Sequence, residues 1–200
     1  MGRRSDHTRE EIRELALQAA SKLVREQGFQ GLSARKVARA IGYTVGSLYL
    51  VFKNLDDLIL QLNARNLEAM YQVVADAGAS IVDPKKRLLA FGNAYLQFAV
   101  AHSHAWRMIF EHRVSDDEAV PEWYEQRITR LFQLVEEPIR EIMLTNDTAV
   151  TQAAKALWSG VHGVCILYMT GKLDVVRVGS VHSLLEHLIR TYLVGLEAGR

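Results

Sequence analysis

The chain of 200 residues has one cysteine, Cys165, and three prolines. A single cysteine forms no intrachain disulfide and no cysteine-based zinc site, so neither device can stabilise the fold. The longest run without a charged residue, between Lys155 and Lys172, is shorter than the roughly 20 apolar residues of a membrane span. The amino terminus lacks the apolar stretch of a signal peptide. We therefore expect a cytoplasmic protein without a membrane segment.

The sequence also lacks the two-residue alternation of apolar and polar side chains that is typical of β-strands. Its apolar residues recur every three or four positions, which is the period of a helix with one buried face. We predict an all-α fold with about nine helices. The first helix begins with the capping-box pair Thr8 and Glu11. Its predicted buried stripe consists of Ile12, Leu15, Ala19 and Leu23.

Charge is distributed unevenly along the chain, although the net charge is only +1. The residues up to Lys53 include ten basic and five acidic side chains, whereas the remainder includes 14 basic and 18 acidic ones. A basic head on a mildly acidic body indicates that only the head meets a polyanion. Chance asymmetry would give the same numbers, so the charge pattern alone does not decide.

Two short helical segments between Ala34 and Lys53 have the spacing of a helix-turn-helix. Ala38 lies four residues before Gly42, and a small residue there lets the second helix cross closely over the first. Gly42 suits a tight turn that other side chains resist. Leu48, six residues after Gly42, would fill the angle between the helices. A helical hairpin inside an ordinary bundle is the alternative interpretation.

The outward face of this motif has the chemistry of a DNA-binding surface. Small side chains at the start of the second helix allow a close approach to base edges in the major groove. Hydroxyl groups there can bond to bases or phosphates, and the cationic side chains suit phosphate contacts. The predicted DNA-binding residues are Arg35, Lys36, Arg39, Thr44, Val45, Gly46, Ser47, Tyr49, Leu50 and Lys53.

The run from Gly28 to Ile59 resembles the N-terminal domain of the tetracycline-repressor (TetR) family. The resemblance implies a dimeric repressor of transcription whose first three helices bind double-stranded DNA. It also implies a helical body that binds a small effector and a second subunit. The matching features are Gly28-Phe29, Leu32-Ser33, Val37-Ala38, Ile41-Gly42, Gly46-Ser47-Leu48-Tyr49, Phe52-Lys53-Asn54 and Leu58.

Three positions depart from the family pattern. Members often carry an aromatic residue and a histidine where this chain has Leu50 and Val51, and a lysine where it has Leu55. Leu50 suits apolar contact with a thymine methyl group. The loss of a cation at Leu55 should lower the salt dependence of DNA binding by about one phosphate contact.

The body of the chain is rich in aromatic residues, which suit either an apolar effector cavity or plain core packing. The run from Trp158 to Gly163 resembles the Trp-His-Gly signature of one subgroup of TetR C-terminal domains. His162 within it is interpreted as a hydrogen-bonded core histidine in preference to a ligand-reading one. The candidate residues for a pocket that binds a small, largely apolar effector are Tyr95, Phe98, Trp106, Phe110, Trp123, Tyr124, Trp158, His162 and Tyr168.

The last two predicted helices present more apolar surface than one buried stripe requires. We expect the second side to form a homodimer, as in the family, and burial within a single domain is the alternative. We divide the chain into a helix-turn-helix DNA-binding domain, residues 1–54, and an effector-binding and dimerisation domain, residues 55–200. The residues that form this apolar surface on the last helix are Val181, Leu184, Leu185, Leu188, Ile189, Tyr192, Leu193 and Leu196.

No catalytic, cofactor or metal motif accompanies these features. His102 and His104 would point about 200° apart on a helix, so they do not converge on a metal. The sequence therefore predicts a non-enzymatic regulator, most simply a repressor, that binds a palindromic operator as a homodimer and is released or modulated by its effector. A dimeric helical adaptor whose helix-turn-helix does not bind DNA is the alternative, followed by a small helical enzyme.

Overall fold

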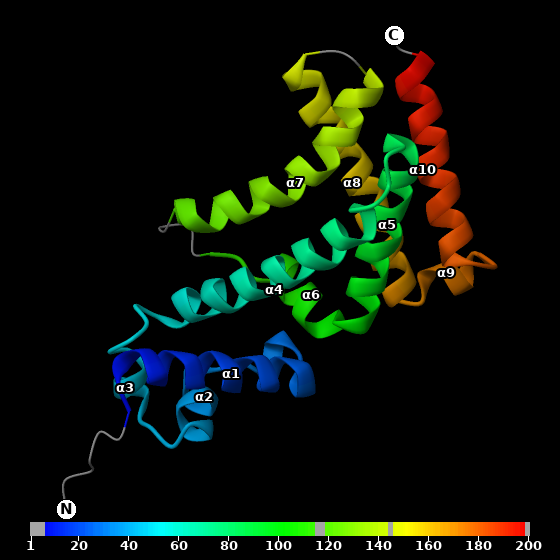
Figure 1. Cartoon of the computed structure of the whole chain (residues 1–200). Coiled ribbons are helices and arrows are strands. Elements are labelled where there is room, and N and C mark those ends of the chain that lie inside the picture. The colour runs from blue at the N-terminus through cyan, green and yellow to red at the C-terminus, as the bar shows by residue number, and fades with distance from the viewer. Residues whose placement is uncertain (1–6, 115–118, 144–145, 199–200) are drawn as a thin grey trace, which may run out of the picture. The chain divides into compact units, whose positions relative to one another are not determined.

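The computed structural model describes residues 7–114, 119–143 and 146–198, and within them the chain is helical and contains no strand. The predicted all-α fold is confirmed. The tenth α-helix counted there, against about nine predicted, is the short α9 between the two predicted last helices. In chain order the helices are α1 (Arg9–Gln27), α2 (Ala34–Ala40), α3 (Val45–Leu48), α4 (Leu55–Gly78), α5 (Pro84–Ala101), α6 (Ser103–Glu111), α7 (Glu122–Met143), α8 (Asp147–Met169), α9 (Lys172–Val175) and α10 (Val181–Ala198), with a 3-10 turn, η1 (Phe29–Gly31), after α1 (Figure 1).

Side-chain caps set the starts of the N-terminal helices. The Thr8 hydroxyl accepts a hydrogen bond from the Glu11 amide at 3.2 Å, and the Glu11 carboxylate accepts one from the Thr8 amide at 2.6 Å. The predicted capping box is therefore confirmed. Ser33 and Thr44 cap α2 and α3 by the same three-residue reach.

The chain divides into two compact units that do not follow the chain order. One comprises the residues up to Asn66 together with His104–Tyr124, and the other comprises Leu67–Ser103 and the residues from Glu125 onward. The first unit thus contains α1, η1, α2, α3, the first half of α4, α6 without Ser103, and the start of α7 as far as Tyr124. The predicted boundary after residue 54 follows the helix-turn-helix and not these units, and it stays a prediction.

The core of the first unit forms around α1, but the buried stripe differs from the predicted one. Ile12 is buried as expected, whereas Leu15 and Leu23 are only half-buried. Ala16 and Ala20 are fully buried instead. Small side chains let neighbouring segments approach α1 closely, so burial follows packing and not side-chain hydrophobicity alone. The buried residues that α1 contributes are Ile12, Ala16, Leu17, Ala20 and Val24.

An ion pair between α1 and α4 makes the stability of this unit sensitive to acid. The Arg65 guanidinium donates to the Glu14 carboxylate, with Nη1 to Oε1 at 3.0 Å, and this holds the pKa of Glu14 at about 2. A lowered folded-state pKa contributes stability above the unfolded value near 4.5, and that contribution disappears as the pH falls toward 2. We expect Glu14→Gln to lower the free energy of unfolding by at most about 1 kcal/mol at pH 7, since both side chains are half-exposed.

Urea unfolding between pH 7 and pH 3 measures the difference in the free energy of unfolding between the wild type and Glu14→Gln. This difference should shrink steadily below pH 5. A difference that keeps its full size at pH 3 would show that Glu14 acts through packing and not through its charge.

In the second unit, α10 packs against α5 and α8. Two glycines allow these approaches: a Cβ atom added to Gly92 would lie 2.5 Å from Ile189 Cδ1, and one added to Gly160 would lie 3.2 Å from Leu188 Cδ2. Leu185, Ile189 and Leu193, spaced four residues apart, form the buried stripe of α10. Across the described ranges, no helix combines the length and apolarity needed to cross a membrane.

Candidate nucleic-acid interface

The predicted helix-turn-helix is present in the first unit. Gly42 has a φ of 74°, in the left-handed region that favours glycine, and it turns the chain between α2 and α3. Tyr43 N donates to Ala38 O at 2.9 Å across this turn. Ala38 is 2% exposed and Leu48 is fully buried, so both lie inside the angle between the helices as predicted.

The recognition helix α3 is shorter than the predicted outward face, which runs from Thr44 to Lys53. Regular helix ends at Leu48, and a turn covers residues 49–51. Leu50 N and Val51 N donate to the carbonyl groups three residues earlier, at 3.3 and 3.1 Å, so the turn remains hydrogen-bonded to α3. The interface therefore consists of a single helical turn followed by a hydrogen-bonded turn.

The structure leaves most of the predicted DNA-binding side chains open to solvent. Val45 and Ser47 are half-buried, because they lie nearer the core side of α3. Leu50, at 66%, is exposed although it is apolar. The exposed candidates are Arg35, Lys36, Arg39, Thr44, Gly46, Tyr49, Leu50 and Lys53.

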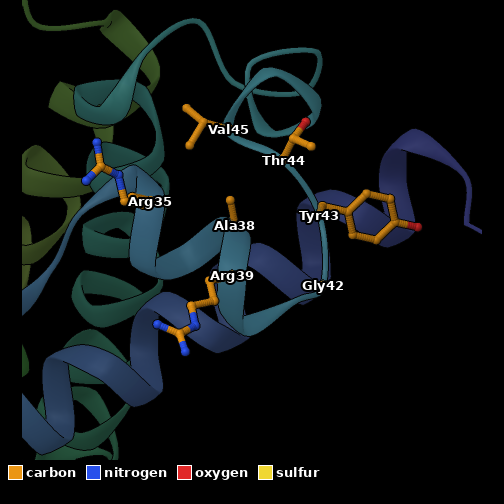
Figure 2. Close-up of a pocket in the computed structure, with 7 residues that line it drawn as sticks. All are labelled: Arg35, Ala38, Arg39, Gly42, Tyr43, Thr44 and Val45. Atoms are coloured by element: carbon orange, nitrogen blue, oxygen red, sulfur yellow. The ribbon is translucent and has the colours of Figure 1, made fainter.

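An open depression of about 410 Å³ lies between α2 and the start of α3. Figure 2 shows Arg35 and Arg39 leaving α2, and Thr44 and Val45 beginning the next element, around this depression. The two guanidinium groups supply the positive charge and hydrogen-bond donors that contact with a phosphate group requires. The residues that line the depression are Arg35, Ala38, Arg39, Gly42, Tyr43, Thr44 and Val45.

Some candidate groups already have partners within the protein. The Thr44 and Ser47 hydroxyl oxygens are 2.9 Å apart, and Thr44 Oγ1 also accepts from Ser47 N at 3.1 Å. Lys36 Nζ donates to Gln27 Oε1 at 2.7 Å and to Gly31 O at 2.8 Å. Lys36 thus stabilises the chain before α2, and a phosphate contact by its ammonium group would compete with these two bonds.

Sequence reasoning missed Tyr43 and treated Val51 only as a departure from the family pattern. Tyr43 lines the depression, and its hydroxyl oxygen lies 2.8 Å from His7 Nδ1. The position of Tyr43 directly after the turn glycine, Gly42, could have indicated that it lies at this surface. Val51 is 7% exposed, and the adjacent Leu50 faces solvent. The two departures therefore have different causes: Val51 belongs to the core, and Leu50 belongs to the surface.

Comparison with protein families covers both parts of the chain. Residues 16–62 match the family model described as bacterial regulatory proteins, tetR family. Residues 88–192, more than half of the chain, match the model described as tetracyclin repressor-like, C-terminal domain. The chain belongs to the TetR family. Regulators of this family are in general not enzymes.

Solved structures of other proteins have the same fold as this chain. The structure of a protein with unknown function from Rhodococcus sp. RHA1 is 19% identical, with a TM-score of 0.78, and the match covers 98% of this chain and 100% of that one. A TetR-like transcriptional regulator from the same organism is 21% identical, with a TM-score of 0.62 and coverage of 96% and 100%. The TetR family regulator PfmR from Thermus thermophilus is 18% identical, with a TM-score of 0.61 and coverage of 91% and 98%. No curated protein matches this TetR chain.

The nine aromatic and histidine candidates for the effector pocket are divided between the two units of this TetR chain. The first unit contains two ring pairs, Trp106 with Phe110 and Trp123 with Tyr124, at centroid distances of 4.9 and 5.8 Å. Trp106 is fully buried, whereas Phe110 is 36% exposed. The candidates in the second unit are Tyr95, Phe98, Trp158, His162 and Tyr168.

Two of the candidates in the second unit, Tyr95 and Trp158, contact a third, His162. The Tyr95 hydroxyl oxygen lies 2.9 Å from His162 Nδ1, and the Trp158 ring lies 5.1 Å from the imidazole ring. Burial lowers the pKa of His162, so the ring is neutral at pH 7. Phe98 instead pairs with His102, and Tyr168 is 41% exposed. The hydrogen bond agrees with a structural role for His162, and the pocket as a whole stays a prediction.

The described residues contain no group of three or more His, Cys, Asp or Glu side chains that could hold a metal ion. Cys165 is fully buried on α8, and this burial raises the pKa of its thiol to about 12. The thiol is therefore protonated at pH 7 and is a poor nucleophile.

Proposed function

We propose that this TetR family chain is a DNA-binding repressor that binds a palindromic operator as a homodimer. A small, largely apolar effector modulates its affinity for DNA. The observation that carries the proposal is the two-sided character of the helix-turn-helix. Its inner side, with Ala38 and Leu48, is buried. Its outer side exposes cations, hydroxyl groups and a glycine on the elements that a major groove accepts.

The homodimer is supported by a second apolar stripe on α10. Leu185, Ile189 and Leu193 are buried within the unit. A parallel row is only half-buried: Leu188 and Tyr192 also contact α8, at Gly160 and at the Ala153 carbonyl group. The apolar surface that this row still exposes is what a second copy would cover. A two-fold dimer would present two copies of α3 to half-sites roughly 34–36 Å apart, about one turn of DNA. This second row consists of Leu184, Leu188, Tyr192 and Leu196.

The effector is supported by the aromatic content of the body and by the match to the tetracyclin repressor-like C-terminal domain. A ligand shifts the equilibrium between two states of the dimer only by its difference in affinity for them. An apolar compound that binds the chain and leaves its operator affinity unchanged would contradict the effector part of the proposal.

Selection from a pool of random duplexes tests the central claim. A repressor of this kind enriches a palindrome with a defined half-site spacing, and its affinity for the enriched duplex falls steeply with salt. The rival interpretation, a dimeric adaptor whose helix-turn-helix only packs, enriches no sequence and gives no gel shift even at low salt.

Lys53 provides a prediction about phosphate contacts. Its side chain is exposed, and its backbone amide, not its ammonium group, bonds to Asp57. We expect Lys53→Ala to weaken binding to the enriched duplex and to reduce the slope of log K against log salt by about 0.9, which is one phosphate contact. Fluorescence anisotropy over a salt series measures both quantities.

The matched control is Lys22→Ala, which removes the same charge from an exposed position on α1, where Lys22 faces Glu26 at 4.0 Å. Its salt slope should equal that of the wild type. Equal slopes for all three proteins would remove Lys53 from the interface.

A further inference from the structure

The recognition segment, residues 44–53, extends beyond the regular helix of α3. Regular helix in α3 covers four residues, Val45–Leu48, and three of the predicted DNA contacts, Tyr49, Leu50 and Lys53, come after it. So short a helix gains little from cooperative backbone hydrogen bonding. Backbone bonds to the carbonyl groups of α3 continue only through the Phe52 amide, so contacts from other helices are needed to fix the rest of the segment.

Arg13 of α1 holds one side of this stretch. Its Nη2 donates to the Val51 carbonyl oxygen at 2.9 Å, across 38 positions of sequence. The same guanidinium carbon lies 5.9 Å from the centre of the Phe52 ring, and Nη1 lies 3.7 Å from a Glu10 carboxylate oxygen. The planar guanidinium group of Arg13, placed over the Phe52 ring, fixes the orientation of the peptide group between Val51 and Phe52.

Asp57 of α4 holds the other side. Its Oδ2 accepts a hydrogen bond from the Lys53 amide at 2.9 Å, and its Oδ1 accepts one from Gln61 at 2.9 Å. Its own amide donates to Asn54 Oδ1 at 2.8 Å. The two peptide groups that flank the buried Phe52 ring are thus held by side chains from different helices.

We propose that Arg13 and Asp57 are positioning residues: they hold Tyr49 and Leu50 in the orientation that reads a DNA sequence, and they hold Lys53 where its phosphate contact sets the register of the interface. This inference rests on the proposed function, because it concerns how the same interface discriminates between sequences. Discrimination requires side chains to be held within a fraction of an ångström of their contacts by supporting hydrogen bonds. Neither residue needs to touch DNA.

The charge of Asp57 makes the proposal testable by the sign of an effect. A carboxylate close to a phosphate backbone repels it, so removal of Asp57 should tighten DNA binding if charge alone matters. If Asp57 positions Lys53, its removal releases the Lys53 amide and loosens the phosphate contact that sets the register of the interface. Discrimination between sequences then falls. Loss of charge repulsion would thus strengthen binding to the preferred duplex, whereas loss of positioning would weaken it.

The experiment uses the full chain and the duplex that the wild type enriches from a random pool. The selectivity is the ratio of Kd values for a scrambled duplex and the enriched duplex, measured well below the melting temperature of each variant. We expect Asp57→Ala and Arg13→Met each to lower the selectivity about tenfold, the size of one misread base pair. Asp57→Asn keeps an acceptor oxygen for the Lys53 amide and should retain the selectivity within about threefold.

Two controls match these variants in charge. Glu14→Ala removes one carboxylate from α1, and Arg65→Met removes one cation from α4. In the wild type these two side chains form an ion pair with each other and not with the recognition segment. Both should keep the wild-type selectivity even where they lower the melting temperature. A merely structural role for Arg13 or Asp57 would change the melting temperature and leave the selectivity unchanged.

The outcomes separate the two proposals. If the wild type enriches a duplex and Asp57→Ala binds it more tightly with full selectivity, the positioning role is overturned and the proposed function stands. If Glu14→Ala loses as much selectivity as Asp57→Ala, the positioning role is likewise overturned. If the wild type enriches no sequence, the proposed function fails, and this inference fails with it.

Discussion

The variant Gly46→Glu is expected to lose at least about a hundredfold in affinity for the enriched duplex while the chain stays folded. Gly46 is the second residue of α3 and is exposed. A Cβ atom there would have only Thr44 Oγ1 within 4 Å, at 3.7 Å, so the protein itself has room for a side chain. The cost of the substitution should therefore arise in the complex with DNA.

The physical chemistry of the helix start separates folding from binding at this position. Glycine is among the weakest helix formers, and a carboxylate in the first turn of a helix interacts favourably with its dipole. The free energy of unfolding of Gly46→Glu should equal or exceed that of the wild type by up to about 1 kcal/mol. In the groove the same side chain adds bulk and a negative charge where the close approach to base edges is expected.

A graded series and a control complete this test. Gly46→Ala adds one methyl group and should give an intermediate loss of affinity. Gly179→Glu makes the same charge change before α10, where an added Cβ atom meets nothing within 4 Å, and should bind as the wild type does. Urea unfolding and anisotropy measure stability and affinity. If Gly46→Glu keeps the wild-type affinity, the start of α3 does not enter the groove.

Features set by neighbouring residues were predictable from the sequence. The capping box at Thr8, the caps at Ser33 and Thr44 and the positive φ of Gly42 each depend on contacts within a few residues. The burial of Leu48 followed from its spacing to Gly42, because a helix-turn-helix leaves one inward position there. Local chemistry and family resemblance therefore indicated the same motif.

Features set by distant contacts were not predictable. The burial of Ala16 and Ala20 ahead of Leu15 on α1 depends on the helices packed against it. The hydrogen bond from Arg13 to Val51 links positions 38 residues apart. The aromatic candidates for the pocket were chosen by residue type, and the structure divides them between two compact units. A periodic pattern identifies a buried face but not the segment that covers it.

Two leucines in the same stretch should respond to truncation in opposite ways. Leu48 is fully buried in the core of the first unit, whereas Leu50 is 66% exposed. We expect Leu48→Ala to lower the free energy of unfolding by about 3 kcal/mol, because it leaves a cavity where the helices cross. Leu50→Ala should change stability by less than about 0.5 kcal/mol, because its side chain contacts little of the protein.

For DNA binding we expect the opposite order: among folded molecules, Leu50→Ala should weaken binding more than Leu48→Ala does. At a temperature where both variants are folded, Leu50→Ala should weaken binding to the enriched duplex about tenfold by losing apolar contact with a thymine methyl group. Replacement of that thymine by uracil should then weaken the wild type and leave Leu50→Ala unaffected. Urea unfolding, followed by anisotropy on both duplexes, measures the whole set. If Leu50→Ala is destabilised as much as Leu48→Ala, a part of the protein covers Leu50 in solution, and its side chain is not available to read DNA.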